Sequence, residues 1–290
     1  MQICRDIPSI RAVLKKERLA DRSIGFVPTM GNLHAGHLSL VTKARELAEK
    51  VVVSIFVNPT QFGANEDLDA YPRTEANDLA LLEAAGVDVV FLPTVEAMYP
   101  NGQDNLTEVI VPKLTETLCG ASRPGHFNGV SSVVTKLFNI VQPDLACFGA
   151  KDYQQLRVVQ KMVQDLAMNV TVVAVPTARA DDGLALSSRN QYLDPDERDT
   201  APKLQIFMQR AIEQLEAGLP LSMAREQLIE SLEHTGFMID YVEFVRPDDL
   251  SVLTETELPC TLAVAAKLGS TRLIDNLPAQ DASASPALSK

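Results

Sequence analysis

Short apolar segments alternate with segments of helical periodicity through the first 176 residues of this 290-residue chain. Residues 24–29, "IGFVPT", predict a buried strand, and residues 37–50, "HLSLVTKARELAEK", predict a helix that follows it. The apolar residues expected to share one stripe of this helix are Leu38, Val41, Ala44, Leu47 and Ala48.

The alternation continues along the chain, and Gly86 is expected to close the second helix. Strand–helix alternation of this kind is typical of a Rossmann-like α/β fold, a parallel sheet with helices on both faces. Ligands of such sheets bind beyond the carboxyl ends of the strands. The further strands are predicted at 51–59, 87–93, 145–150 and 170–176, and the further helices at 73–86, 127–143 and 152–169.

The pattern changes after Pro176, where a polar loop precedes two consecutive helical segments, 194–218 and 221–236. Strand-like segments at 238–245 and 260–268 follow them. We therefore expect a second, smaller α+β domain. The predicted division is 1–177 for the Rossmann-like domain, 178–280 for the small domain and 281–290 for a flexible tail rich in small and polar residues.

The composition favours a cytoplasmic enzyme. The net charge of −12 argues against a nucleic-acid partner, since phosphate contacts need clustered Lys and Arg. No run of about 18 apolar residues predicts a membrane span, and the charged start does not resemble a signal peptide. The four cysteines are scattered without C-x-x-C spacing, so we expect reduced thiols.

The stretch "PTMGNLHAGHLSL" (28–40) holds two of the four histidines, His34 and His37. They could ligate a metal, form a hydrogen-bonded pair at a helix start, or donate to an anion. Metal ligation is the weakest reading, because His126 and Cys147 could complete a zinc site only through an arbitrary fold. The position between a strand and a helix favours an anion, since free N–H groups and the positive end of the helix dipole lie there. Gly36 would let a ligand approach the backbone closely.

The glycines of this stretch do not complete either common phosphate-binding motif. Gly31 to Gly36 spells G-x-x-x-x-G, but His37 stands where a Walker loop has Lys, and no G-x-G-x-x-G is present.

Two further clusters follow predicted strands. In "FGAKDYQQL" (148–156), Lys151 and Asp152 suit phosphate and ribose hydroxyls, or form a solvated Lys beside a helix-capping Asp. In "LALSSRN" (184–190), two hydroxyls and a guanidinium suit phosphate oxygens, although such a stretch alone is more often an ordinary polar loop.

Three other side chains are candidates by position. Gln61, in "VNPTQFG", follows a core strand and is either an orienting ligand group or a loop-end amide. Arg123 and His126, in "SRPGHF", precede a helix as an anion contact or a turn.

Taken in order, six stretches of the sequence resemble the pantothenate synthetase family, the pantoate–β-alanine ligases of the H-x-G-H nucleotidyltransferase superfamily. The resemblance spans roughly residues 1–280, and an isolated H-x-G-H is far less specific than the whole series. The six stretches are "PTMGNLHAGH", "FVNPTQFG", "YPRT", "RPGHF", "FGAKDYQQL" and "LSSRN".

This resemblance implies ATP-dependent condensation of pantoate with β-alanine through a pantoyl adenylate, with Mg²⁺, releasing AMP and pyrophosphate. It implies a homodimer, with nucleotide and pantoate bound by the first domain and the small domain acting as a lid. His37, His34, Lys151 and Arg189 would be the catalytic residues. Gln61 would bind pantoate and β-alanine, and Gln155 pantoate. The implied ATP contacts are Met30, Gly31, Asn32, Leu33, His34, Ala35, Gly36, His37, Gly149, Ala150, Lys151, Asp152, Ala178, Leu186, Ser187, Ser188 and Arg189.

Two positions depart from the family pattern: Ala150 replaces its usual Glu, and Ala35 a common acidic residue. Neither removes a catalytic group. The metal ligands do not transfer, and Asp78 in "RTEANDLA" is a candidate only.

Two alternative functions remain at this point. A related nucleotidyltransferase acting on another small acid or phosphate would share the H-x-G-H loop but should lack "FVNPTQFG" and the pair of Gln61 and Gln155. A catalytically silent relative should have lost a charged or imidazole position, and none is lost.

Overall fold

The computed structural model describes residues 1–63, 66 and 68–280, and the chain divides into two compact units. The first unit comprises 1–112, 123–150 and 155–178, and the second comprises 113–122, 151–154 and the chain from Arg179 onward. The change from first to second unit after Ala178 lies one residue from the division expected from the sequence. The tail predicted at 281–290 lies outside the described residues.

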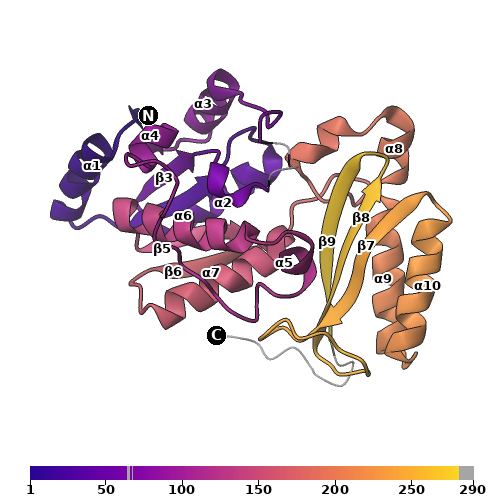
Figure 1. The fold of residues 1–290 in the computed structure, drawn as a ribbon. Coiled ribbons are helices and arrows are strands. Elements are labelled where there is room, and N and C mark those ends of the chain that lie inside the picture. The colour runs from indigo at the N-terminus through magenta and orange to yellow at the C-terminus, as the bar shows by residue number, and fades with distance from the viewer. Residues whose placement is uncertain (64–65, 67, 281–290) are drawn as a thin grey trace. The chain divides into compact units, whose positions relative to one another are not determined.

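The first unit is built on a six-stranded sheet in the order β1-β4-β3-β2-β5-β6, in which every pairing is parallel (Figure 1). The predicted parallel sheet is confirmed. Its strands are β1 (Gln2–Cys4), β2 (Ile24–Thr29), β3 (Lys50–Ile55), β4 (Val89–Phe91), β5 (Leu145–Gly149) and β6 (Thr171–Val175).

Helices cover both faces of this sheet, as predicted. Adjacent residues of a strand point to opposite faces. Accordingly, Phe26 meets Phe138 of α6 edge-on at 6.3 Å between ring centroids, whereas Val27 packs with Leu40 and Ala44 of α2. The helices are α1 (Ile7–Leu19), α2 (Ala35–Leu47), α3 (Glu75–Ala84), α4 (Val95–Met98), α6 (His126–Val141) and α7 (Tyr153–Asp165), with short 3₁₀ turns η1 (Pro59–Gln61) and η2 (Ala150–Asp152).

The apolar stripe predicted for α2 is partly wrong. The buried residues of the helix are Leu40, Val41 and Ala44, while Leu47 is 44% exposed. The reason is that α2 ends at Leu47 and Ala48 follows it in extended conformation, so the helical stripe does not continue to Ala48.

Among the other expectations for the first unit, the helix end at Gly86 is confirmed and the bounds of the strand expected at 51–59 are wrong. Gly86 follows α3 with φ +73°, which confirms its predicted role at the helix end. The strand predicted at 51–59 is too long, because the chain leaves the sheet after Ile55 and Pro59 begins η1. Strand β1 and helix α1 were not predicted from the sequence.

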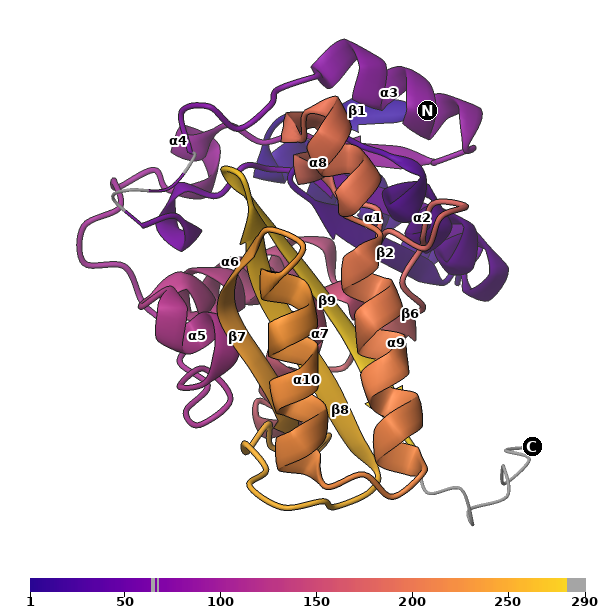
Figure 2. The same cartoon turned by 90° about the vertical axis from the view of Figure 1, so that its right-hand side faces the viewer.

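The second unit contains a three-stranded antiparallel sheet in the order β7-β8-β9, with α9 and α10 beside it (Figure 2). Leu204 and Met208 of α9 and Leu228 of α10 share one buried core with Leu262 and Val264 of β8. The predicted small α+β architecture is confirmed, although β9 was missed. The elements are α5 (Leu118–Ser122), η3 (Ser188–Tyr192), α8 (Pro195–Thr200), α9 (Lys203–Glu216), α10 (Leu221–Glu233), β7 (Phe237–Val245), β8 (Cys260–Leu268) and β9 (Thr271–Ala279).

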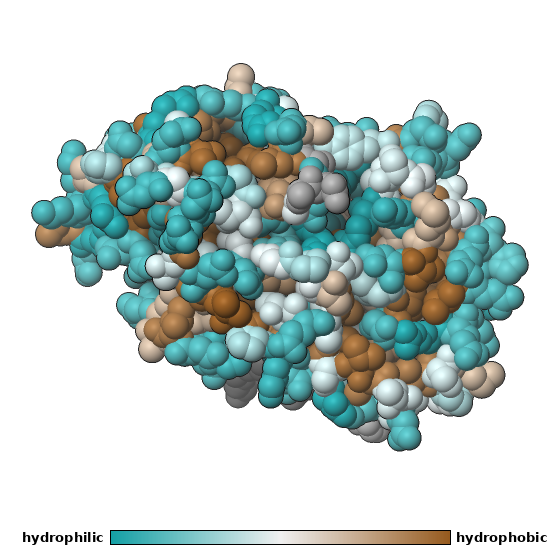
Figure 3. Space-filling model, viewed as in Figure 1, coloured by the Kyte–Doolittle hydropathy of each residue, from teal (hydrophilic) through white to brown (hydrophobic). Residues whose placement is uncertain are grey.

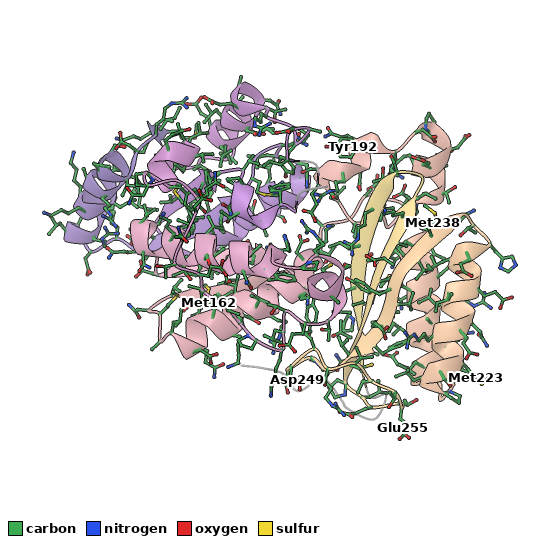
Figure 4. The ribbon with its side chains drawn as sticks, viewed as in Figure 1. Met162, Tyr192, Met223, Met238, Asp249 and Glu255 are labelled. Carbon is green, nitrogen blue, oxygen red and sulfur yellow. The ribbon has the colours of Figure 1, made fainter. Side chains whose placement is uncertain are left out.

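The exposed apolar side chains are scattered. Met223 of α10 and Met238 of β7 (labelled in Figure 4) are 46% and 58% exposed. Figure 3 shows a face on which hydrophilic residues separate small hydrophobic patches. Within 1–63, 66 and 68–280, no helix is long and apolar enough to cross a membrane.

Candidate active site

The strand order of the first unit creates a switch point at β2. From β2 the chain proceeds through β3 to β4 on one side, whereas β5 and β6 lie on the other. The loops that follow β2 and β5 therefore diverge, and a crevice beyond the strand ends is where open α/β sheets bind ligands. Met30 to His34 form the loop after β2 and residues 35–37 open α2, while Ala150 directly follows Gly149, the last residue of β5. This confirms that both motifs follow strands.

The turn after β2 depends on backbone conformations that most side chains avoid. Gly31 has φ +83° and Asn32 has φ +49°. The hydroxyl of Thr29 accepts a hydrogen bond from the Gly31 N–H (3.3 Å) and donates to the Ser54 carbonyl (2.8 Å). A Cβ at Gly31 would lie 3.0 Å from Asp78 Oδ2. A glycine is therefore required here for both conformation and space.

The side-chain carboxylate of Asp78, in α3, accepts hydrogen bonds from the backbone of this turn. Its Oδ2 accepts from the Asn32 N–H (2.9 Å) and its Oδ1 from the Leu33 N–H (2.8 Å), and Thr74 donates to Oδ1 at 3.1 Å. The residue is only 1% exposed, so this charge is stabilised by donors and not by water. Asp78, considered above only as a metal candidate, is thus a structural anchor of the H-x-G-H loop.

His34 and His37 cap the start of α2 with their rings. His34 Nδ1 accepts from the Gly36 N–H (3.1 Å), and His37 Nδ1 accepts from the His34 N–H (3.4 Å). The ring centroids are 4.2 Å apart and the ring planes are inclined by 52°. Because each Nδ1 is an acceptor, the proton of each neutral ring belongs on Nε2. The hydrogen-bonded pair at a helix start is therefore present, in a tautomer that makes each Nε2–H a donor.

Metal ligation by these histidines finds no support in the described residues. Among them, no group of three or more His, Cys, Asp and Glu side chains is placed to hold a metal ion. Zinc sites normally require three or four such ligands.

Gln61 lies beside the same loop, at the end of η1. Its side-chain amide donates to Met30 Sδ (3.1 Å), and its Oε1 accepts from Asn58 Nδ2 (3.2 Å). The structure thus brings together two residues that are 31 positions apart in the sequence. Tyr99 completes the arrangement by donating from its hydroxyl to Asn58 Oδ1 (2.7 Å).

Asn58 and Tyr99 were not singled out from the sequence. The available signal was weak: Asn58 follows a core strand and precedes Pro59, which places a polar side chain near the carboxyl end of the sheet. Asn58 is only 1% exposed, and it also donates to the Gly129 carbonyl at 3.2 Å. It links η1 to α6.

Arg123 and His126 support the other side of Gln61. His126 Nδ1 lies 2.8 Å from the Gln61 carbonyl oxygen and its Nε2 lies 3.0 Å from Arg123. Arg123 also forms a bidentate pair with Glu66, at 2.6 Å for each bond. The hydrogen bonds from Arg123 hold the pKa of the Glu66 carboxyl below its ordinary value. Arg123 thus donates to Glu66 from the turn that precedes α6.

The remaining predicted site residues lie at two places in the chain. Lys151 and Asp152 stand at the end of β5, with Lys151 Nζ 3.9 Å from Asp152 Oδ1. Of the two glutamines that follow, Gln154 is buried and donates to the Leu114 and Thr117 carbonyls, whereas Gln155 is half-buried.

The segment Leu186 to Arg189 precedes and enters η3. Ser187 is the N-cap of this turn, and its hydroxyl accepts from the Arg189 N–H at 3.3 Å. The two units share the predicted contacts: Met30 to His37, Gln61, Gly149, Ala150, Gln155 and Ala178 belong to the first, and Lys151, Asp152 and Leu186 to Arg189 to the second.

Comparison with known proteins gives one consistent result. A family model described as pantoate-beta-alanine ligase matches residues 2–278. A pantothenate synthetase from Stutzerimonas stutzeri is 52% identical over 278 residues, covering 96% of this chain and 97% of that protein.

Solved structures agree. A crystal structure of pantothenate synthetase from Thermus thermophilus is 46% identical with a TM-score of 0.89, covering 96% of this chain and 99% of that one. A pantoate-beta-alanine ligase from Francisella tularensis, complexed with beta-gamma ATP and beta-alanine, is 34% identical with a TM-score of 0.80 and covers 96% and 97%.

Proposed function

The chain belongs to the pantoate–β-alanine ligase family, which joins its substrates through an amide bond with the use of ATP, and we propose that it does so here through a pantoyl adenylate. The observation that carries this proposal is the loop after β2. It presents two imidazoles of defined tautomer at the start of α2, where the helix dipole favours an anion.

In the first step, a carboxylate oxygen of pantoate attacks the α-phosphorus of ATP. A P–O bond forms to pantoate, and the bond to the leaving pyrophosphate breaks. Pantoate arrives ionised, so no general base is needed, and the demand is for donors that relieve phosphate charge. His34 and His37 meet that demand through Nε2–H, together with Lys151, Arg189 and the two serine hydroxyls before Arg189. The other proposed ATP contacts are Met30, Gly31, Asn32, Leu33, Ala35, Gly36, Gly149, Ala150, Asp152, Ala178 and Leu186.

In the second step, the amine of β-alanine attacks the carbonyl carbon of the adenylate, and the C–O bond to AMP breaks. Gln61 orients pantoate and β-alanine, and Gln155 orients pantoate. The support for Gln61 is that it is buried beside Met30 and held by Asn58, so its amide has a defined direction. The amine loses a proton during this step, and the second unit serves as a lid that keeps the adenylate from water.

The family resemblance implies Mg²⁺, but the described residues do not fit a protein-held ion. They contain no group of three or more His, Cys, Asp and Glu side chains placed to hold an ion, and the Asp78 carboxylate already accepts from two backbone N–H groups and a hydroxyl. We propose that Mg²⁺ arrives with the ATP phosphates, which is its usual mode of binding in nucleotide enzymes. We also propose a cytoplasmic homodimer that acts on small molecules without nucleic acid or membrane.

The test is ATP–pyrophosphate exchange with pantoate and Mg²⁺ in the absence of β-alanine. Exchange of labelled pyrophosphate into ATP that depends on pantoate supports both the acid substrate and a separable adenylate. If pantoate gives no exchange and adding β-alanine releases no AMP, the proposed activity is wrong.

A further inference from the structure

Two adjacent polar residues on β9 each hold a different segment of the second unit. Asp275 is only 4% exposed, and it lies on the same face of the strand as buried Thr271 and Leu273. Asn276 follows it and is half-buried. Because β9 pairs regularly with β8 from residue 271 to residue 279, these two side chains project from opposite faces of the sheet.

Asp275 binds Arg179 through a bidentate pair. The two guanidinium nitrogens lie 2.6 and 2.9 Å from the two carboxylate oxygens. Arg179 also donates to the Gly183 carbonyl at 3.1 Å, and the Asn276 N–H donates to Asp275 Oδ1 at 2.8 Å. The planar guanidinium thus connects a strand to a loop with a fixed geometry.

The loop held by Arg179 is a tight hairpin that leads into the Leu186–Arg189 segment. Arg179 pairs with Ala185 in an isolated antiparallel bridge, and Ala180 and Leu184 are joined by a backbone hydrogen bond of 2.9 Å. Leu184 packs into the core of the second unit. Residue 186 therefore starts from an anchored position, shortly before η3, whose last residue Tyr192 is labelled in Figure 4.

Asn276 holds the second segment. Its side-chain amide donates to the carbonyl oxygen of Lys151 at 2.9 Å. This bond fixes the backbone at the residue whose ammonium group is proposed to reach the phosphates, across 125 positions of sequence.

Stability alone is a poor explanation for the Asp275–Arg179 pair. Burying two charges costs desolvation free energy that their attraction often fails to exceed, so an apolar pair of similar volume would stabilise the unit at least as well. An apolar pair could not form the two directional hydrogen bonds by which the guanidinium fixes the hairpin.

We infer that Asp275 and Asn276 are positioning residues for ATP, Asp275 acting through Arg179 on the Leu186–Arg189 segment and Asn276 acting on Lys151. This inference rests on the proposed function, in which those two segments contact the nucleotide. The two residues do not touch substrate themselves. They set the distance between two groups of phosphate donors from a single rigid strand.

The experiment measures KM and kcat for each substrate, and ATP affinity by calorimetry, in Asp275→Asn, Arg179→Ala, Arg179→Lys and Asn276→Ala. Displacing a catalytic group by about 1 Å costs on the order of a hundredfold, so we expect the KM for ATP to rise by about 10- to 100-fold in Asp275→Asn and Arg179→Ala. Arg179→Lys keeps the positive charge but lacks the planar guanidinium that binds both carboxylate oxygens. Its KM for ATP should therefore lie between that of Arg179→Ala and that of the native protein. The KM for β-alanine should change far less than the KM for ATP.

Glu243→Gln is the matched control. It breaks another Arg–carboxylate pair of the same unit, Arg225 with Glu243 at 2.6 Å, between α10 and β7. Its midpoint of thermal unfolding should fall without a change in the KM for ATP. Asn276→Ala leaves the ion pair intact and gives a second test if Asp275→Asn unfolds.

Unchanged ATP affinity in Asn276→Ala and Arg179→Ala would overturn the inference, as would a loss that Glu243→Gln reproduces. Failure of the proposed function is a different result, since the unmodified protein would then form no pantothenate while calorimetry still reports on its nucleotide binding.

Discussion

Replacing Asp78 by Asn tests whether this carboxylate shapes the H-x-G-H loop. The substitution preserves size but exchanges one acceptor oxygen for an NH₂ group. In the native protein each carboxylate oxygen accepts a backbone N–H, from Asn32 and from Leu33. In Asp78→Asn the new side-chain NH₂ group would face one of these two backbone N–H groups. The two donors would meet in a buried site, because residue 78 is only 1% exposed.

The expected loss of ATP affinity follows from the lost hydrogen bond between a backbone N–H group and the carboxylate. A hydrogen bond to a charged group contributes about 1.5 to 3 kcal/mol, and a buried donor left unpaired costs about 1 to 3 kcal/mol. We therefore expect the native loop conformation to lose about 2 to 3 kcal/mol relative to other loop conformations. Since about 1.4 kcal/mol is tenfold in an equilibrium constant, the apparent affinity for ATP should fall by at most about 30- to 150-fold.

The assay is calorimetric titration with ATP, with and without Mg²⁺. A loop effect persists when Mg²⁺ is replaced by EDTA, whereas a loss caused by a missing metal ligand disappears under that condition. Asp88→Asn is the matched control, because Asp88 accepts from the Val51 N–H (2.9 Å) and pairs with Lys50 (2.7 Å) at the opposite, amino end of β3. Native ATP affinity in Asp78→Asn, or an equal loss in Asp88→Asn, would refute the reasoning.

Three other predictions concern the same unit. His37→Ala should reduce adenylate formation by about 10²- to 10³-fold, because a phosphate donor is lost. Its free energy of unfolding should fall by only about 1 kcal/mol, because only a helix cap is lost. A fully active variant would remove His37 from the mechanism. Gly31→Ala should destabilise by about 1 to 2 kcal/mol in urea unfolding, because an L-residue is strained at positive φ, and an unchanged midpoint would argue against the turn described here. Arg123 lowers the pKa of Glu66 from its ordinary value of 4.5, so the stability from this pair is present above pH 4.5 and is lost as the pH falls through the lowered value. Glu66→Gln should therefore lose less stability than the native protein between neutral pH and that acidic range, and parallel curves of unfolding free energy against pH would contradict the assignment.

The elements with strong periodicity were predictable, and those marked by polar residues were not. Strand β2 has the predicted bounds of 24–29 because its residues are buried from both faces and Pro28 and Thr29 lie near its end. Strand β9 was missed because "TRLIDNLPA" contains Arg272, Asp275 and Asn276, whose hydrogen bonds to distant segments replace apolar contacts. Alternation of burial is present in β9, but hydropathy alone does not reveal it.

The candidate site was predictable as a set of motifs and not as a set of contacts. The positions of His34, His37 and Gln61 after their strands followed from the alternation of strands and helices. The support beneath them did not, because Asp78 acts on backbone N–H groups 45 and 46 residues away, which leave no pattern in the sequence. The same holds for Asn58 and Tyr99, whose roles depend on how η1, α4 and α6 pack.

The most direct test of the adenylate mechanism uses pantoate labelled with ¹⁸O in its carboxylate, together with ATP, Mg²⁺ and β-alanine. A carboxylate oxygen that attacks the α-phosphorus stays with that phosphorus when the amine displaces AMP. Mass spectrometry should therefore find one ¹⁸O in each AMP formed. Unlabelled AMP, or label in inorganic phosphate accompanied by ADP, would contradict the account.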